Sequence, residues 1–221
     1  MNDYQKRFID FMLEVGVLTF GDFTTKSGRK TPYFINTGLY RSGSQMATLG
    51  RAYADTIEAS FPEGFDVLFG PAYKGIPLVT AVSMAFAERD RNVEFCFNRK
   101  EAKDHGEGGV LVGRRLNDGD RVLIVEDVTT AGTSIRETVP ILKAAANVNL
   151  AGLVVSVDRQ ERHGDDATQS ALAELSDEFG MPVAAIVDLD DILEHLGDRI
   201  GEVERDRIEA YRALHGVPTR S

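Results

Sequence analysis

Residues 121–134 read RVLIVEDVTTAGTS, and this stretch decides the fold. It opens with four consecutive apolar residues, Val122 to Val125, most of them β-branched. Such a run is typical of a strand that is buried on both faces, as in a parallel sheet. The positions that follow the loop recur at helical spacing: Ile135, Thr138, Val139 and Leu142. The sequence therefore predicts a strand, a short loop and a helix in that order.

The loop of this unit carries the chemistry. Glu126 and Asp127 follow the strand directly, and a small, hydroxylated run comes next: Thr129, Thr130, Ala131, Gly132, Thr133 and Ser134. Backbone N–H groups at a helix start attract anions, and glycine lets a backbone approach a ligand closely. Two carboxylates would repel an anion unless they bind ribose hydroxyls or help hold a magnesium ion that a pyrophosphate also ligates. The alternative, an ordinary capped turn, accounts poorly for so many carboxylates and hydroxyls in one loop.

Composition narrows the class of protein. The 221 residues suit a single domain, and 43% hydrophobic with 27% charged residues is typical of a globular chain. A net charge of −10 argues against a general nucleic-acid surface, and no apolar run is long enough for a membrane span. The single cysteine, Cys96, lies in an apolar stretch, and it fits a buried residue in a reducing cytoplasm. The four histidines show no paired metal-ligand spacing.

Two further polar segments follow predicted strands. Residues 65–78, FDVLFGPAYKGIPL, repeat the order of strand, tight loop and helix, with Lys74 in the loop as a second candidate anion site. Residues 98–109, NRKEAKDHGEGG, follow the strand predicted at 93–97 and combine cations with three glycines. We interpret them as a flexible lid whose cations stabilise a departing pyrophosphate; a solvated hairpin tip is the alternative.

The N-terminal part predicts a hairpin with its turn at Gly28. Lys26 lies across this hairpin from Tyr33 and Phe34, and a cation beside an aromatic wall suits a flat anionic ring. We interpret Arg29 and Lys30 as members of a solvated turn. Arg159 follows the strand predicted at 150–157, where open α/β sheets bind ligands, so it is a candidate for a carboxylate or carbonyl; a surface salt bridge to Glu161 or Asp158 is the alternative.

These segments define the expected architecture. The fold class is α/β, with a Rossmann-like, mostly parallel sheet flanked by helices. The whole chain, 1–221, is expected to form one domain, whose parts are a hood at about 1–40, a core at about 60–190, a flexible lid at about 99–109 and C-terminal helices at about 190–215. No P-loop signature and no G-x-G-x-x-G occurs in the chain, which excludes those two nucleotide-binding motifs.

Residues 121–134 resemble the phosphoribosyl-diphosphate (PRPP) signature of the type I phosphoribosyltransferases. The resemblance narrows to the bacterial orotate phosphoribosyltransferases through five segments, in order: FTTKSGRKTPYF, FGPAYKGIPL, FCFNRKEAKDHGEGG, VEDVTTAGTSIRE and SVDRQERHG. It implies transfer of the phosphoribosyl group from PRPP to orotate, which gives orotidine 5′-phosphate and pyrophosphate in pyrimidine synthesis. It also implies a cytoplasmic homodimer in which each lid reaches the partner's active site.

The resemblance also implies residue roles. Lys103 and Asp127 are the expected catalytic residues. Orotate is expected to contact Lys26, Phe34, Thr130 and Arg159. PRPP is expected to contact Tyr73, Lys74, Arg99, Lys100, Lys103, His105, Glu126, Asp127, Val128, Thr129, Thr130, Ala131, Gly132, Thr133 and Ser134. No residue is expected to bind metal directly, because Mg²⁺ is carried mainly by PRPP, with water-mediated contacts to Glu126 and Asp127.

Two positions depart from the family pattern. Ile35 stands where a second aromatic residue is common, and Glu126 stands where aspartate is frequent. Three rival functions are weaker. A purine phosphoribosyltransferase would not need Lys26, Phe34 and Arg159, a PRPP-sensing regulator would carry a basic DNA-binding segment, and a dinucleotide-binding domain would carry its glycine fingerprint.

Overall fold

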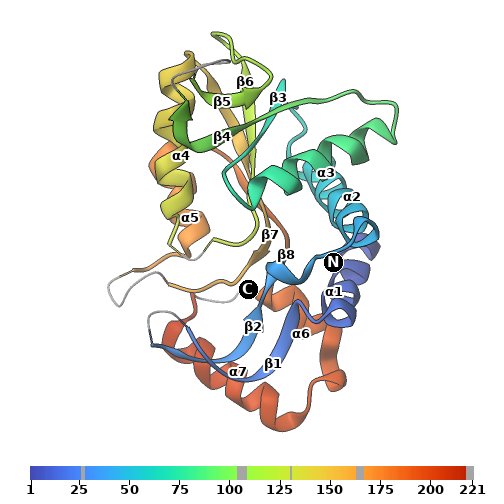
Figure 1. The fold of residues 1–221 in the computed structure, drawn as a ribbon. Helices are drawn as coiled ribbons and strands as arrows, with labels where there is room; N and C mark the ends of the chain where they lie inside the picture. Colours follow the sequence, from blue (N-terminus) through green and yellow to red (C-terminus); the bar gives the residue numbers. More distant parts are fainter. Residues whose placement is uncertain (26–27, 104–108, 130, 163–166, 218–221) are drawn as a thin grey trace.

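A six-stranded sheet forms the centre of the fold (Figure 1). The computed structural model describes residues 1–25, 28–103, 109–129, 131–162 and 167–217. The strands are β3 (Val67–Gly70), β4 (Glu94–Lys103), β5 (Gly109–Gly113), β6 (Arg121–Val125), β7 (Asn149–Asp158) and β8 (Val183–Asp188). Their order is β5-β4-β3-β6-β7-β8, and every neighbouring pair is parallel except β4 and β5. The predicted, mostly parallel α/β sheet is confirmed.

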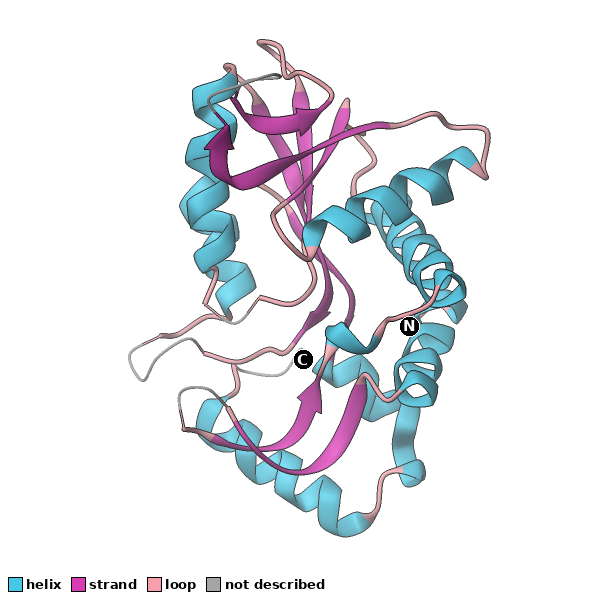
Figure 2. Cartoon of the chain, in the orientation of Figure 1, coloured by secondary structure: helices cyan, strands magenta, loops and turns pink. Residues whose placement is uncertain are grey.

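Helices cover both faces of this sheet (Figure 2). Helices α2 (Gly43–Ser60) and α3 (Gly75–Ala87) lie on one face, and α4 (Thr133–Ala145) and α5 (Ala171–Phe179) lie on the other. Side chains alternate along a strand, so Val122 and Ile124 of β6 join the apolar cluster under α4, whereas Leu123 and Val125 join the cluster under α2 and α3. All four are fully buried, as their apolar run predicted.

A smaller layer joins the two ends of the chain. Its two-stranded sheet, β1 (Leu18–Thr24) and β2 (Lys30–Ile35), lies beside α7 (Glu202–His215) in Figure 1, and the rings of Tyr33 and Tyr211 meet edge to face at 6.0 Å. Its other helical elements are α1 (Asp3–Val15), α6 (Leu189–Leu196) and the short turns at Thr37–Leu39 and Gly197–Arg199. The predicted turn at Gly28 is confirmed, with φ at +84°. Within the described residues, no helix has the length and apolar character that crossing a membrane requires.

One sequence-based boundary was wrong. Residues 99–103, predicted to begin an irregular lid, continue β4, because Lys103 pairs with Gly109 of β5. Residues 104–108 of that predicted lid lie outside the described part of the chain. Helix α5 begins at Ala171, since the Ser170 hydroxyl accepts a hydrogen bond from Ala173 N at 3.2 Å and caps the helix there.

Candidate active site

Three loops meet at the carboxyl edge of the sheet. Strands β3, β6 and β7 are adjacent and parallel, so the loops at 71–74, 126–132 and 159–162 leave the same edge. The chain proceeds from β3 to β4 on one side and then returns to place β6 on the other side of β3. Such a reversal opens a crevice between the loop after β3 and the loop after β6. Open α/β sheets bind ligands in a crevice of this kind. The two predicted anion-binding loops therefore flank the switch point.

An ion pair joins the two loops across this point. Lys74 Nζ donates to Asp127 Oδ2 at 2.6 Å and to Thr37 Oγ1 at 3.0 Å, and the Thr37 hydroxyl donates to Asp127 Oδ2 at 2.7 Å. Burial alone would raise the pKa of Asp127, but the hydrogen bonds from Lys74 and Thr37 outweigh it and the pKa is lowered. Asp127 is therefore an anion that is paired with the Lys74 cation. A pocket of about 150 Å³, partly lined by Tyr40, opens beside this pair.

The second carboxylate, Glu126, points into the loop that follows it. Its Oε2 accepts from Ser134 Oγ at 2.7 Å, and its Oε1 accepts from the backbone N of Asp127 at 3.0 Å. Burial raises the pKa of Glu126 to about 7, and the nearby Asp127 charge adds to the shift. The carboxyl group therefore bridges the first residue of the loop and Ser134, and its pKa lies well above the ordinary value of a glutamate.

The loop backbone turns at Gly132, which caps α4. Gly132 has φ at +68°, a conformation that favours glycine, and a Cβ atom there would lie 2.8 Å from Leu175 Cδ2. Its N–H donates to Thr129 Oγ1 at 3.0 Å, and α4 begins at Thr133. The loop thus delivers the N-terminus of a helix to the crevice, as an anion-binding site requires, with Val128 and Ala131 as its apolar members. Thr130 lies outside the described residues.

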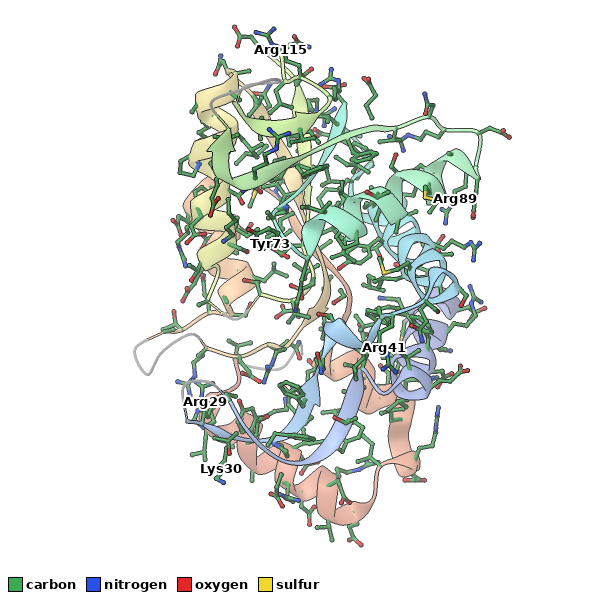
Figure 3. The ribbon with its side chains drawn as sticks, in the orientation of Figure 1. Arg29, Lys30, Arg41, Tyr73, Arg89 and Arg115 are labelled. Atoms are coloured by element: carbon green, nitrogen blue, oxygen red, sulfur yellow. The ribbon has the colours of Figure 1, made fainter. Side chains whose placement is uncertain are left out.

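The opposite loop presents an exposed ring. Tyr73 is 70% exposed, and Figure 3 places it near the middle of the molecule, beside the start of α3. The preceding residue is fixed by Asn98, whose side-chain oxygen accepts from Ala72 N at 2.8 Å. Asn98 is buried at the point where β4 passes the loop. It therefore supports the loop that carries Tyr73 and Lys74.

The predicted lid cations extend from the same strand. Arg99 and Lys100 follow Asn98 in β4, and Lys100 Nζ lies 3.6 Å from the Glu137 carboxylate of α4. Both partners of that pair are about half exposed, so the contact is weak. The backbone of Lys103 ends β4, whereas its side chain and the whole of His105 lie outside what the structure describes.

Arg159 lies against the β1–β2 hairpin. This position is consistent with a ligand site between the hairpin and the loop after β7. Its side chain is only 10% exposed, its guanidinium carbon lies 5.0 Å from the Tyr33 ring, and Nη2 donates to Glu161 Oε1 at 2.7 Å. Arg159 is therefore paired with Glu161, yet the pair is buried rather than on the surface. Phe34, one residue along β2, is 37% exposed and stacks on Phe23 at 5.5 Å.

The two cations at the hairpin turn behave differently. Arg29 is not simply solvated, because its Nη1 lies 3.5 Å from Glu161, whereas Lys30 is exposed as expected (Figure 3). The aromatic ring that contacts Arg159 is Tyr33 rather than Phe34. Lys26 lies outside the described residues.

Sequence reasoning missed the residues that complete these contacts. Thr37 and Asn98 are single polar residues with no recognisable pattern, and Tyr33 and Glu161 were noticed only as neighbours of other candidates. A local signal existed for Glu161 alone, since it is an acid two residues beyond an arginine. The contacts of Thr37, Asn98 and Tyr33 depend on how segments that are distant in the sequence pack together.

Comparisons with known proteins define the class. The family model described as "Phosphoribosyl transferase domain" matches residues 39–184, which include the loops at the switch point. The chain therefore belongs to the phosphoribosyltransferase family.

Individual relatives narrow the class. An orotate phosphoribosyltransferase from Clostridium beijerinckii is 54% identical over 98% of this chain and 100% of its own length. The crystal structure of the Francisella tularensis orotate phosphoribosyltransferase is 41% identical, with a TM-score of 0.84 over 95% of this chain and 99% of that one. A Mycobacterium tuberculosis orotate phosphoribosyltransferase in complex with PRPP is 21% identical over 86% of this chain and 98% of that one, with a TM-score of 0.63, which shows the shared fold. Within the wider family, the chain belongs to the orotate phosphoribosyltransferases.

Proposed function

We propose that this chain transfers the 5-phosphoribosyl group from PRPP to orotate, giving orotidine 5′-phosphate and pyrophosphate in pyrimidine nucleotide synthesis. The observation that carries the proposal is the Lys74–Asp127 pair across the switch point of the sheet, beside a glycine-turned loop that begins a helix. That arrangement offers an anion, a cation and a set of N–H donors to one sugar phosphate. Family membership supports orotate as the acceptor.

The loop from Glu126 to Ser134 holds the ribose and its 5-phosphate. Backbone N–H groups at the start of α4 and the hydroxyls of Thr129, Thr133 and Ser134 face the phosphate, and Thr130 also approaches orotate. Asp127 accepts from ribose hydroxyls once Lys74 releases it, because a carboxylate that accepts a hydrogen bond from Lys74 can exchange this donor for another. The Asp127 carboxylate is thereby held beside the ribose before the bond between the ribose and pyrophosphate breaks.

Pyrophosphate departure is assisted by cations. Tyr73 and Lys74 contact it from the loop after β3. In the proposed dimer, the neighbouring subunit supplies further cations to it: Arg99, Lys100, Lys103 and His105. Negative charge grows on the leaving oxygen as the ribose becomes an oxocarbenium-like cation, so donors placed there stabilise the transition state more than the bound substrate. Lys103 contributes most of this catalysis.

Orotate is held by Lys26, Phe34, Thr130 and Arg159. Arg159 is the residue of this set whose surroundings the structure defines best, and its buried guanidinium suits a carboxylate because a fork of N–H groups matches two oxygens. Orotate is already an anion, so its ring nitrogen needs little base catalysis to attack. The protein's contribution is to position the ring and exclude water.

Magnesium is expected to arrive with PRPP. Carboxylate oxygens at Glu126 and Asp127 suit a hard divalent cation, but Glu126 engages Ser134 and Asp127 engages Lys74. The donor set therefore fits water-mediated contact to a metal held by the pyrophosphate, where the metal neutralises phosphate charge.

The assembly we propose is a cytoplasmic homodimer in which each lid reaches the partner's site. It rests on the family resemblance of residues 98–109 and on the position of β4 and β5 at the edge of the sheet, from which a lid can extend.

The experiment is loss of orotate absorbance in the presence of PRPP and Mg²⁺. We expect loss that requires all three components and stops in excess chelator. A chain that is folded by circular dichroism yet consumes no orotate, under conditions where a known orotate phosphoribosyltransferase does so, would overturn the proposed function.

A further inference from the structure

We propose that Glu161 and Tyr33 are positioning residues that fix the guanidinium of Arg159 and thereby set the affinity of the site for the carboxylate of the pyrimidine. The inference rests on the proposed function, since it assigns a purpose to contacts around Arg159. It concerns two residues that do not themselves touch the substrate.

One carboxylate oxygen of Glu161 accepts hydrogen bonds from both Arg159 and Tyr33. Glu161 Oε1 accepts from Arg159 Nε at 3.0 Å, from Arg159 Nη2 at 2.7 Å and from the Tyr33 hydroxyl at 2.5 Å. Nε and Nη2 form one edge of the guanidinium, and Glu161 occupies that edge. Nη1 takes no part in these two hydrogen bonds. The guanidinium is therefore held by one edge, and its other end is available to a second carboxylate.

The Tyr33 ring fixes the remaining freedom. The centroid of the ring lies 5.0 Å from the Arg159 guanidinium carbon, a distance typical of a cation over an aromatic face. Burial, together with the Glu161 charge, raises the pKa of Tyr33 well above its ordinary value, so the hydroxyl stays protonated and keeps donating at neutral pH. The ring is itself buried and packs edge to face on Tyr211 of α7. Arg159 is thus confined between a rigid ring and a fixed carboxylate.

The backbone brings Arg159 and Glu161 together by a turn that is held from outside. Gln160, between them, has φ at +53°, a conformation that a residue with a side chain rarely adopts. Its side-chain amide makes two hydrogen bonds with Asp190, donating to the carboxylate at 3.0 Å and accepting from the backbone N at 3.1 Å. Arg212 of α7 donates to the same Asp190 carboxylate. The cost of the turn indicates that the geometry at Arg159 matters.

The charges of Arg159, Arg29 and Glu161 favour the binding of one more anion. Arg159 and Arg29 both approach Glu161, so two cations face one carboxylate and the cluster carries a net positive charge. The side chains of Arg159 and Glu161 are 10% and 14% exposed, and screening by water is weak at such burial. An incoming carboxylate would neutralise the cluster.

Removal of the Glu161 charge separates two explanations. If Glu161 were only a counter-ion, Glu161→Gln would leave Arg159 more attractive to an anion, and the Michaelis constant for orotate would fall. If Glu161 positions the guanidinium, the same substitution weakens the edge contact, and the constant rises. We expect a rise of about tenfold for Glu161→Gln and of about threefold for Tyr33→Phe, with the constant for PRPP changed less than about twofold.

The experiment measures both Michaelis constants and the turnover number for these variants, with the thermal midpoint of each. Glu88→Gln is the matched control, since Glu88 accepts two hydrogen bonds from Arg51 on the exposed surface of α2 and α3. It should leave all constants unchanged. Tyr33→Phe removes a single oxygen atom, so it tests the proposal even if Glu161→Gln fails to fold.

A double-mutant cycle identifies the route of the effect. In an Arg159→Met background, Glu161→Gln should cause no further rise in the orotate constant, because the group that it positions is gone. An equal rise in both backgrounds, an unchanged orotate constant in both single variants, or equal rises for orotate and PRPP would each overturn the inference. In all of these results the wild-type chain still converts orotate, whereas failure of the proposed function would appear as no turnover by the wild type.

Discussion

Arg159→Lys is the substitution that most sharply probes recognition of orotate. It keeps the positive charge but replaces a planar fork of donors by a single ammonium group. Arg159 uses Nε and Nη2 for Glu161 and keeps its other end available. A lysine would have to share one ammonium between Glu161 and the ligand. We therefore expect weaker orotate binding although the charge is unchanged.

The magnitude follows from the contacts. Losing a hydrogen bond to a charged partner costs about 1.5–3 kcal/mol, which corresponds to roughly a ten- to hundredfold change in binding. Because lysine retains the charge, the lower end applies, and the orotate Michaelis constant should rise about tenfold. The neutral Arg159→Met should reach the upper end. It should also lower stability, since it leaves the buried Glu161 carboxylate with fewer partners, a change that typically costs about 3–5 kcal/mol when a buried pair is broken.

The assay follows orotate absorbance at saturating PRPP and then varies PRPP at saturating orotate. Arg51→Lys is the control, because Arg51 also donates from Nε and from Nη2 to a glutamate, at 2.9 and 3.3 Å, but on an exposed surface. It should behave as the wild type. An unchanged orotate constant for Arg159→Lys, or an equal rise in the PRPP constant, would refute the assignment of Arg159 to the orotate carboxylate.

Three further predictions concern the PRPP loop and the lid. Lys103→Ala should lower the turnover number strongly and leave both Michaelis constants nearly unchanged, because it removes stabilisation of charge that develops only as pyrophosphate leaves; a raised PRPP constant with normal turnover would contradict this. Mixing Lys103→Ala with Asp127→Ala should restore activity toward half the wild-type level per heterodimer, and exchange of subunits without recovery would show that each lid serves its own chain. Stability measured by urea unfolding should fall as pH rises from about 4.5 through about 7, because the pKa of folded Glu126 is raised from 4.5 to about 7 and the folded state binds the extra proton. The slope from this group is at most about 1.4 kcal/mol per pH unit and should vanish in Glu126→Gln; an identical slope in the variant would assign it elsewhere.

The strands and the loops that follow them could be predicted from the sequence, because they depend on the local order of apolar and polar residues. An apolar run such as Val122 to Val125 can satisfy its surroundings only inside a sheet, and the carboxylates after it must then lie at the sheet edge. The same reasoning placed Lys74 after β3. Because strand order was not needed to place either loop at that edge, both anion-binding candidates could be predicted without knowing which strands are neighbours.

The contacts that complete the site could not be predicted in this way. Thr37 meets Asp127 across 90 positions, and Tyr33 meets Glu161 across 128 positions. Such pairs depend on how the small N-terminal sheet docks on the core, which no local periodicity encodes. The extension of β4 to Lys103 was not predicted for a related reason. Arg99, Lys100 and Glu101 are not buried, so no apolar pattern marks them as a strand, and the strand there is defined by pairing with β5.

The most direct test of the account is a comparison of acceptor bases. The ratio of turnover number to Michaelis constant should be measured for orotate, uracil, adenine and hypoxanthine with PRPP and Mg²⁺, and the products identified by mass. We expect orotate to be used far better than the other three, with one orotidine 5′-phosphate and one pyrophosphate formed per PRPP consumed. Use of a purine at a comparable rate, or equal use of uracil, which lacks the carboxylate, would contradict it.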